Sequence, residues 1–186
     1  RTMIFVPCTT SLVAYSIIFR SLFANDGLVN YVLVNLGILD KPYNFLTQPF
    51  AAKIVIILAL LWRWTGYNMV FFLSGLQNIE YSVYEAAKID GASAIQTFFK
   101  ITVPLLKPTI LLTAIMSTNG TLQLFDESVN LTDGGPANAS ISMSHYIYNL
   151  CFKYVPNFGY AAAMSFFILL LVAVLAFIQM RVGDKR

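Results

Sequence analysis

Four long apolar stretches dominate the hydrophobic pattern of this chain, at about residues 2–23, 51–74, 109–125 and 160–180. About 20 helical residues cross the roughly 30 Å hydrocarbon core of a bilayer. Backbone polar groups in lipid must also find their hydrogen-bond partners within the segment, which a helix allows. We therefore predict four transmembrane helices, of which the third is the shortest and most polar.

A charged segment, about residues 80–108, separates the second apolar stretch from the third. It contains two capping-box sequences, Ser82–Glu85 and Ser93–Gln96, each of which predicts the start of a short helix. Gly91 is placed to end the first helix in the left-handed conformation. Pro104 and Pro108 are expected to end the second, because proline cannot donate to the helical ladder. The segment is thus predicted to be a helix-turn-helix that is presented to a partner on one side of the membrane.

Composition agrees with the membrane prediction. The chain is 58% hydrophobic and 11% charged, with a mean hydropathy of +0.68, whereas soluble domains carry roughly 25% charged residues. The net charge of +3 contains no basic cluster dense enough to bind nucleic acid. We predict an all-α, polytopic transmembrane helix bundle with a helix-turn-helix loop, and no nucleic-acid partner.

The distribution of lysine and arginine predicts the orientation. If segment 80–108 is cytoplasmic, most of these residues lie on the cytoplasmic side, namely Arg1, Lys88, Lys100, Lys107, Arg181, Lys185 and Arg186. The other side then holds Lys41, Lys53 and Lys153, with Arg20 near the outer end of its span. This excess inside follows the positive-inside rule. Both ends are therefore expected in the cytoplasm, with connections 24–50 and 126–159 outside.

The charged segment also resembles a known motif. Glu85-Ala86-Ala87, Asp90-Gly91-Ala92, Ile101 and Pro104 are similar to the EAA loop of permease subunits of binding-protein-dependent ABC importers, and most of all to maltose-type sugar permeases. The similarity continues into Gly75–Ile79, Phe125–Glu127 and Leu131–Pro136. Segment 80–108 is called the EAA loop below. The resemblance implies that it docks on an ATPase through Glu85, Ala86, Ala87, Asp90, Gly91 and Ala92.

The same resemblance implies the wider assembly. Its members are a second permease subunit, two ABC ATPase subunits and an extracytoplasmic solute-binding protein, in the bacterial inner membrane, with a sugar or related polyol as solute. No Walker-type loop occurs in the chain, so ATP is expected on the ATPase partners and no cofactor on this chain. Such permeases usually have about six or more spans, so we read the chain as the C-terminal part of one, with the early spans missing.

Two sets of polar residues within the spans are candidates for a solute path. Trp64, Tyr67 and Asn68 share one helix face and offer aromatic rings and an amide to a sugar. On the third stretch, Thr113, Ser117 and Thr121 repeat every four residues as a polar stripe, with Asn119 and Gly120 adjacent, and Ser117, Asn119 and Thr121 are taken as path candidates. The same spacings also fit helix packing and, for the aromatic residues, anchoring at the membrane interface.

Charged and aromatic residues near these sets carry further expectations. Arg63 lies near the middle of its span, where an isolated charge is costly, and is expected to pair with an acid on a missing span or a partner subunit. Asp126 and Glu127 are expected at a solvated loop start. In the EAA loop, Phe98, Phe99 and Ile101 are expected to pack against the span ends.

Other functions have less support from the sequence. With one histidine, His145, we expect neither a histidine-based triad nor a two-histidine metal site. Cys8 and Cys151 fall in a span and an external loop, so no disulfide is expected. The chain is therefore not expected to be an enzyme. A secondary transporter or channel subunit, or an ABC permease for a non-sugar solute, stays open as an alternative.

Overall fold

The computed structural model describes Val6 and residues 8–183, and this part of the chain contains helices and loops but no strand. The all-α prediction is thereby confirmed. The elements are α2 (Leu12–Leu22), α3 (Leu28–Asn35), α4 (Pro49–Gln77), α5 (Tyr81–Ile89), α6 (Ala94–Thr97), the π-helical η1 (Phe98–Thr102), α7 (Val103–Leu105), α8 (Lys107–Leu122), α9 (Asp126–Thr132), α10 (Met143–Tyr148), the π-helical η2 (Asn149–Lys153) and α11 (Phe158–Gly183).

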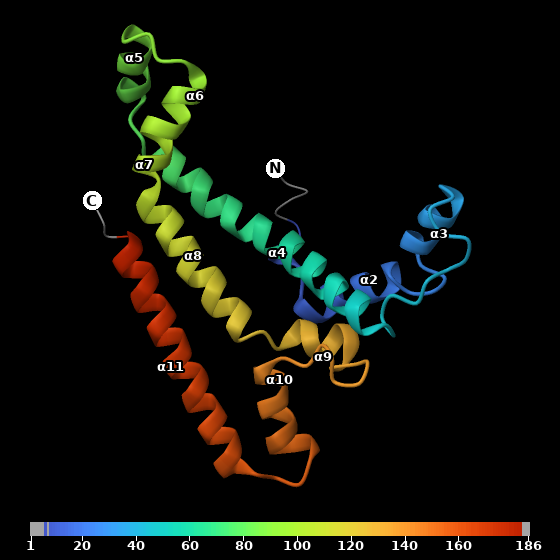
Figure 1. Cartoon of the computed structure of the whole chain (residues 1–186). Coiled ribbons are helices and arrows are strands. Elements are labelled where there is room, and N and C mark those ends of the chain that lie inside the picture. The colour runs from blue at the N-terminus through green and yellow to red at the C-terminus, as the bar shows by residue number, and fades with distance from the viewer. Residues whose placement is uncertain (1–5, 7, 184–186) are drawn as a thin grey trace.

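Three long helices, α4, α8 and α11, lie side by side in one layer (Figure 1). Within the described residues, α4 with 29 residues and α11 with 26 are long and apolar enough to cross a membrane. A third span results if α8 is joined to the helical segment Ala94–Leu105 across a bend of 65°. Helix α8 packs against both α4 and α11, so it occupies the centre of this layer.

The first apolar stretch is not one continuous helix. A bend at Thr10 and Ser11 precedes α2, which is 11 residues long. The hydroxyls of Thr9 and Thr10 both donate to the carbonyl of Val6, each at 2.9 Å. Threonine hydroxyls that take up backbone carbonyls compete with the helical ladder, which accounts for the difference from the helix expected over residues 2–23. Residues 2–5 and Pro7 lie outside the described residues.

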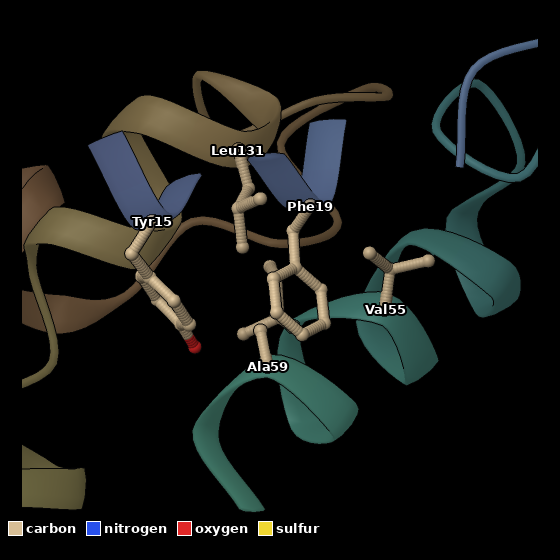
Figure 2. Packing of buried hydrophobic residues seen from close by; sticks show 6 residues of the cluster. Tyr15, Phe19, Val55, Ala59 and Leu131 are labelled. Atoms are coloured by element: carbon tan, nitrogen blue, oxygen red, sulfur yellow. The ribbon is translucent and has the colours of Figure 1, made fainter. Parts of the chain in front are cut away.

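The hydrophobic core joins three elements that are distant in the sequence. Tyr15 and Phe19 of α2 meet Val55 and Ala59 of α4 and Leu131 of α9, all of them buried (Figure 2). Burying a side chain of this size stabilises a fold by roughly 1.5–3 kcal/mol. The cluster therefore holds α2 and α9 against the N-terminal half of α4.

The second helical segment of the EAA loop, Ala94–Leu105, ends between the two prolines, in agreement with the predicted stop, although neither proline is its last residue. Pro104 stands in the first turn of α7 and Pro108 in the first turn of α8. Proline is tolerated there because the first turn of a helix leaves its N–H groups without helical partners. The chain instead turns at Leu106, between α7 and α8, where the 65° bend lies. The EAA loop is thus continuous with α8 through one sharp bend.

The EAA loop and helices α9 and α10 lie at opposite ends of the layer. Figure 1 shows α5 and α6 projecting beyond the ends of α4 and α8, far from α9 and α10.

The α2–α4 connection, which carries α3, is held together by Asn30. Its side-chain amide donates to the carbonyls of Ala24 and Tyr43, both at 2.9 Å, and accepts from the N–H of Tyr43 at 2.8 Å.

Candidate functional site

The corner of the EAA loop is a well-formed helix C-cap. Gly91 has a φ of +72°, which confirms the predicted left-handed residue. The N–H of Ala92 donates to the carbonyl of Ala87 at 2.9 Å, and the N–H of Gly91 donates to that of Lys88 at 3.1 Å. This pair of bonds is the Schellman motif. Backbone bonds therefore set the angle between α5 and α6.

One predicted capping box is confirmed and the other is wrong. The hydroxyl of Ser93 accepts from the N–H of Gln96 at 3.3 Å, while the Gln96 side chain accepts from the N–H of Ser93 at 2.9 Å. Helix α5 instead begins at Tyr81, two residues earlier than Ser82–Glu85 implied, with Glu80 as its N-cap. The Ser82 hydroxyl donates to the Glu80 carboxylate at 3.2 Å. The carboxylate of Glu85 therefore has no capping role.

The six predicted docking residues lie around this corner, with different exposures. Glu85, Ala86, Asp90 and Gly91 are exposed. Ala92 is half-buried, and Ala87 is buried with 5% of its surface accessible. The exposed carboxylates of Glu85 and Asp90 can meet a cationic partner, whereas Ala87 lets α5 pack closely.

Large apolar side chains surround these carboxylates. Ile89 is 87% exposed and Ile95 72%, and neither was singled out in the sequence. Phe98 and Phe99 are also exposed, with ring centroids 5.0 Å apart, so the predicted packing against span ends is wrong for both; Ile101 is half-buried. Phe98, Phe99 and Ile101 belong to the π-helical turn η1, which departs from α-helical register. Such apolar patches mark docking surfaces.

A hydrogen bond ties the two arms of the EAA loop together. The hydroxyls of Tyr84 in α5 and Thr102 in η1 lie 3.3 Å apart. Thr102 is buried and precedes the bend into α8 by a few residues. This contact therefore links α5 to η1 close to the bend that leads into α8.

A cavity of about 410 Å³ lies between the middle of α4 and the C-terminal end of α8. Trp64 and Tyr67 line it from α4, and their rings meet edge to face with centroids 5.4 Å apart. Gly120 of α8 lines it too, and a Cβ atom there would lie 2.4 Å from the Trp64 indole. The missing side chain at Gly120 thus makes room for the Trp64 ring.

The remaining path candidates do not share this cavity. The Asn68 amide donates to the hydroxyl of Ser117 at 3.3 Å, which links α4 to α8. Ser117 and Thr121 border a separate hollow of about 380 Å³, and the Thr121 hydroxyl donates to the Ser117 carbonyl at 2.8 Å. Asn119 faces a third cavity, of about 610 Å³, between α8, α10 and α11. The six predicted residues therefore do not line one common cavity.

The intramembrane arginine has its partner within this chain. Nη1 of Arg63 lies 3.5 Å from Oε1 of Glu127, the second residue of α9. Glu127 is buried, with 5% of its surface exposed, so the expectation of a solvated loop start is wrong for this residue. The Arg63 guanidinium also lies 5.9 Å from the Tyr15 ring centroid. The α2–α4–α9 core brings these residues together, and no local sequence signal pairs them.

A buried polar cluster joins α9 to α10. The Ser128 hydroxyl donates to the Ser140 carbonyl at 2.8 Å and accepts from the Ser142 N–H at 3.2 Å. It therefore accepts from Nδ1–H of His145 at 2.9 Å. Nε2 of His145 is then an acceptor without a hydrogen-bond partner among the described residues, 3.9 Å from the Asp133 carboxylate.

This cluster brings serine and aspartate side chains together around His145, the single histidine, which was not expected to form a triad. Their arrangement is not that of an activated nucleophile. Ser128 is fully buried, and its proton is donated to a carbonyl. The described residues also contain no group of His, Cys, Asp or Glu side chains able to hold a metal ion, and Cys8 and Cys151 are free thiols. The cluster holds the α9–α10 connection in place.

Acidification is expected to loosen this connection. Burial lowers the pKa of His145 below 6.5, Lys153 lowers this pKa further, and Asp133 opposes both effects. The folded state thus favours the neutral imidazole, and the stabilisation present above about pH 6.5 is lost as the pH falls through the lowered pKa. We expect the melting temperature to fall between about pH 7.5 and about pH 5.5. The His145→Asn variant keeps a donor to Ser128 but does not titrate, so its melting temperature should fall less over the same pH range. An equal fall in both proteins would assign the pH effect to a group other than His145.

Comparisons with known proteins place this architecture in a family. Residues 1–186 match the family described as "Binding-protein-dependent transport system inner membrane component". The lactose transport system permease protein LacF of Rhizobium radiobacter is 56% identical over 100% of this chain and 63% of its own length. The arabinooligosaccharides permease AraP of Bacillus subtilis is 33% identical over 100% of this chain and 59% of its own length.

Solved structures agree with the fold. A bacterial ABC transporter that imports the acidic polysaccharide alginate superposes with a TM-score of 0.87 at 24% identity, over 99% of this chain and 64% of that one. A bacterial alginate ABC transporter in complex with an alginate pentasaccharide-bound periplasmic protein gives 0.78 at 25% identity, over 98% and 62%. The chain thus spans less than two thirds of the length of these relatives. It belongs to the inner membrane components of binding-protein-dependent transport systems.

Proposed function

We propose that this protein is the permease subunit of an ABC importer for a sugar or related polyol. The observation that carries the proposal is the course of α4 and α8, which run from an exposed helix-turn-helix to an aromatic, charged cavity at the middle of α4 and the C-terminal end of α8. The sugar assignment is supported by the names of relatives, among them a lactose permease 56% identical over the whole chain.

Energy is proposed to come from outside this chain. One of the two ATPase subunits docks on the EAA loop of this chain. Glu85 and Asp90 accept hydrogen bonds from its cationic side chains, and Ile89, Ile95 and Phe99 supply apolar contact. Closure of the ATPase pair moves α5, and the Tyr84–Thr102 contact and the bend at Leu106 carry the movement into α8. A second permease subunit completes the path, and the two rock around a central solute site.

The solute is proposed to arrive from a binding protein at the end of the molecule that carries α3, α9 and α10. It then contacts Trp64 and Tyr67 in the cavity, with Asn68, Ser117, Asn119 and Thr121 serving other states of the path. Trp64 and Tyr67 have the most direct support, because both line the same cavity, together with charged residues.

Thiol labelling tests the proposed orientation, with the EAA loop and both chain ends in the cytoplasm. Ala94 begins α6 and Val155 lies between η2 and α11; both are exposed. Figure 1 shows α6 and the N-terminal end of α11 at opposite ends of the molecule. In a variant without Cys8 and Cys151, Val155→Cys should react with a membrane-impermeant maleimide from outside intact cells. Ala94→Cys should react only with a permeant reagent. The reverse pattern would overturn the orientation and the docking role together.

Transport itself is tested in proteoliposomes that contain the full-length protein with its partner subunits and binding protein. We expect ATP-dependent uptake of radiolabelled lactose, and Trp64→Ala should raise the KM by about tenfold to a hundredfold, because losing a ring contact or a hydrogen bond costs roughly 1–3 kcal/mol. ATP hydrolysis without solute should be unchanged, since the EAA loop is intact. If wild-type protein takes up no sugar in this assay, the proposed function fails.

A further inference from the structure

We propose that the Arg63–Glu127 ion pair makes the α4–α8–α9 cavity a site for an uncharged carbohydrate and excludes sugar acids. The proposal rests on the proposed function, which it extends to the class of sugar. None of the path residues predicted from the sequence carries a charge. The proposal therefore assigns selectivity to two further residues, Arg63 and Glu127.

The ion pair opens onto the cavity that Trp64 and Tyr67 line. Arg63, Asp126 and Glu127 all contribute to its wall, together with Gln123 at the end of α8. The volume of about 410 Å³ lies within the roughly 300–1,000 Å³ of small-molecule sites. Aromatic rings and ionised groups therefore face one enclosed space, which suits a ligand with apolar C–H faces and many hydroxyls.

The pair has hydrogen-bonding capacity left over. A guanidinium carries five N–H donors and a carboxylate two acceptor oxygens, but the contact at 3.5 Å joins one nitrogen to one oxygen. The described residues give the guanidinium of Arg63 no other hydrogen-bond partner, and none to the indole N–H of Trp64 or the hydroxyl of Tyr67. Among the described residues, unpaired donors on α4 and carboxylate acceptors on α9 thus line the same cavity, a combination that suits the hydroxyls of a sugar.

The charges in the wall do not balance. One guanidinium stands against two carboxylates, those of Asp126 and Glu127, so the net charge is minus one. Charges in the cavity wall are weakly screened by salt, so the net negative charge would repel a carboxylate on the solute. The one cation that lines the cavity in the described part of the chain, Arg63, is already paired with Glu127. Glu127 is buried and directly contacts Arg63, so the positive charge of the arginine is already offset by one carboxylate, although its remaining N–H groups can still meet neutral hydroxyls. A neutral sugar meets no such penalty.

The test uses two matched probes, lactose and the derivative whose 6′ hydroxymethyl group is oxidised to a carboxylate. Uptake of both is measured in proteoliposomes with the full-length protein, its partner subunits and one binding protein throughout. Because the binding protein is constant, a change in preference between variants reports on the permease alone. Wild-type protein should import lactose in preference to the acid.

Changing the cavity charge should change that preference. Asp126→Asn with Glu127→Gln makes the net charge plus one, and the preference for lactose should fall by about tenfold for each unit of charge. Arg63→Gln leaves two unpaired carboxylates, so the KM for lactose should rise about tenfold. The exchange Arg63→Glu with Glu127→Arg keeps both pair and net charge, and the preference should be kept. Asp40→Asn, an exposed carboxylate outside the cavity, is the control and should leave the preference unchanged.

The outcomes separate the inference from the function on which it rests. If wild-type protein imports neither probe, sugar import itself fails. If it imports lactose but the Asp126→Asn, Glu127→Gln variant keeps the wild-type preference, the inference is wrong and the function stands. Should single substitutions prevent assembly, the charge-exchanged variant decides, because loss of the preference there at normal complex yield also overturns the inference.

Discussion

Replacing Ile89 by aspartate is expected to separate the permease from its ATPase partner and to lower ATP-driven uptake by about a hundredfold. Ile89 is the most exposed large apolar side chain of the EAA loop, at 87%, and ends α5 one residue before the C-cap. Burying it in an interface stabilises a complex by roughly 1.5–3 kcal/mol. The aspartate variant would lose this stabilisation and would place an unpaired charge in the buried interface. The measurement is co-purification of the ATPase, alongside uptake normalised to the amount of permease in the membrane.

A matched control exists at the far end of the molecule. Ile38 is also an exposed isoleucine, at 64%, in the connection between α3 and α4. Ile38→Asp makes the same chemical change at a place that should not touch the ATPase, so co-purification should stay at the wild-type level. Wild-type yields of ATPase with Ile89→Asp would show that the apolar patch around the EAA corner is not the docking surface.

A methyl group at Gly120 is expected to disrupt the packing of α4 on α8. A Cβ atom there would lie 2.4 Å and 2.6 Å from two carbons of the Trp64 indole. The ring is rigid and already packs edge to face on Tyr67, so relief requires either the helices to separate or the ring to turn into the cavity. Overpacking of this kind costs roughly 1–3 kcal/mol. Gly120→Ala should therefore lower both the melting temperature of the complex and sugar uptake per complex.

Two variants make this prediction sharp. Gly159→Ala adds the same methyl group at the start of α11, where the nearest atom is 4.0 Å away, and should change neither measurement. Gly120→Ala combined with Trp64→Leu removes the clash, so stability should recover while uptake stays low because the ring is gone. If the double variant were no more stable than Gly120→Ala alone, the close approach of Gly120 to Trp64 would not be what limits stability.

The local pattern of residues was enough for the elements of the EAA loop. Gly91 adopts the left-handed conformation, and Ser93 with Gln96 forms the predicted capping box. Both features depend on a few neighbouring residues, because capping and left-handed turns are short-range backbone effects. Where more than one local solution existed, the sequence misled. The first capping box competes with a start at Glu80, and prolines that can end a helix can equally stand in its first turn.

Apolar length alone determined that this chain is helical and suited to a membrane, because lipid requires a backbone that satisfies itself. Only the tertiary structure decided what the charges and polar stripes do. Arg63 and Glu127 lie 64 positions apart and meet because α2, α4 and α9 share a core. Ser117 and Thr121 border one hollow while Asn119, between them in the sequence, faces another, since α8 packs between α4 and α11. Such placements follow from contacts between distant segments, which a local pattern does not encode.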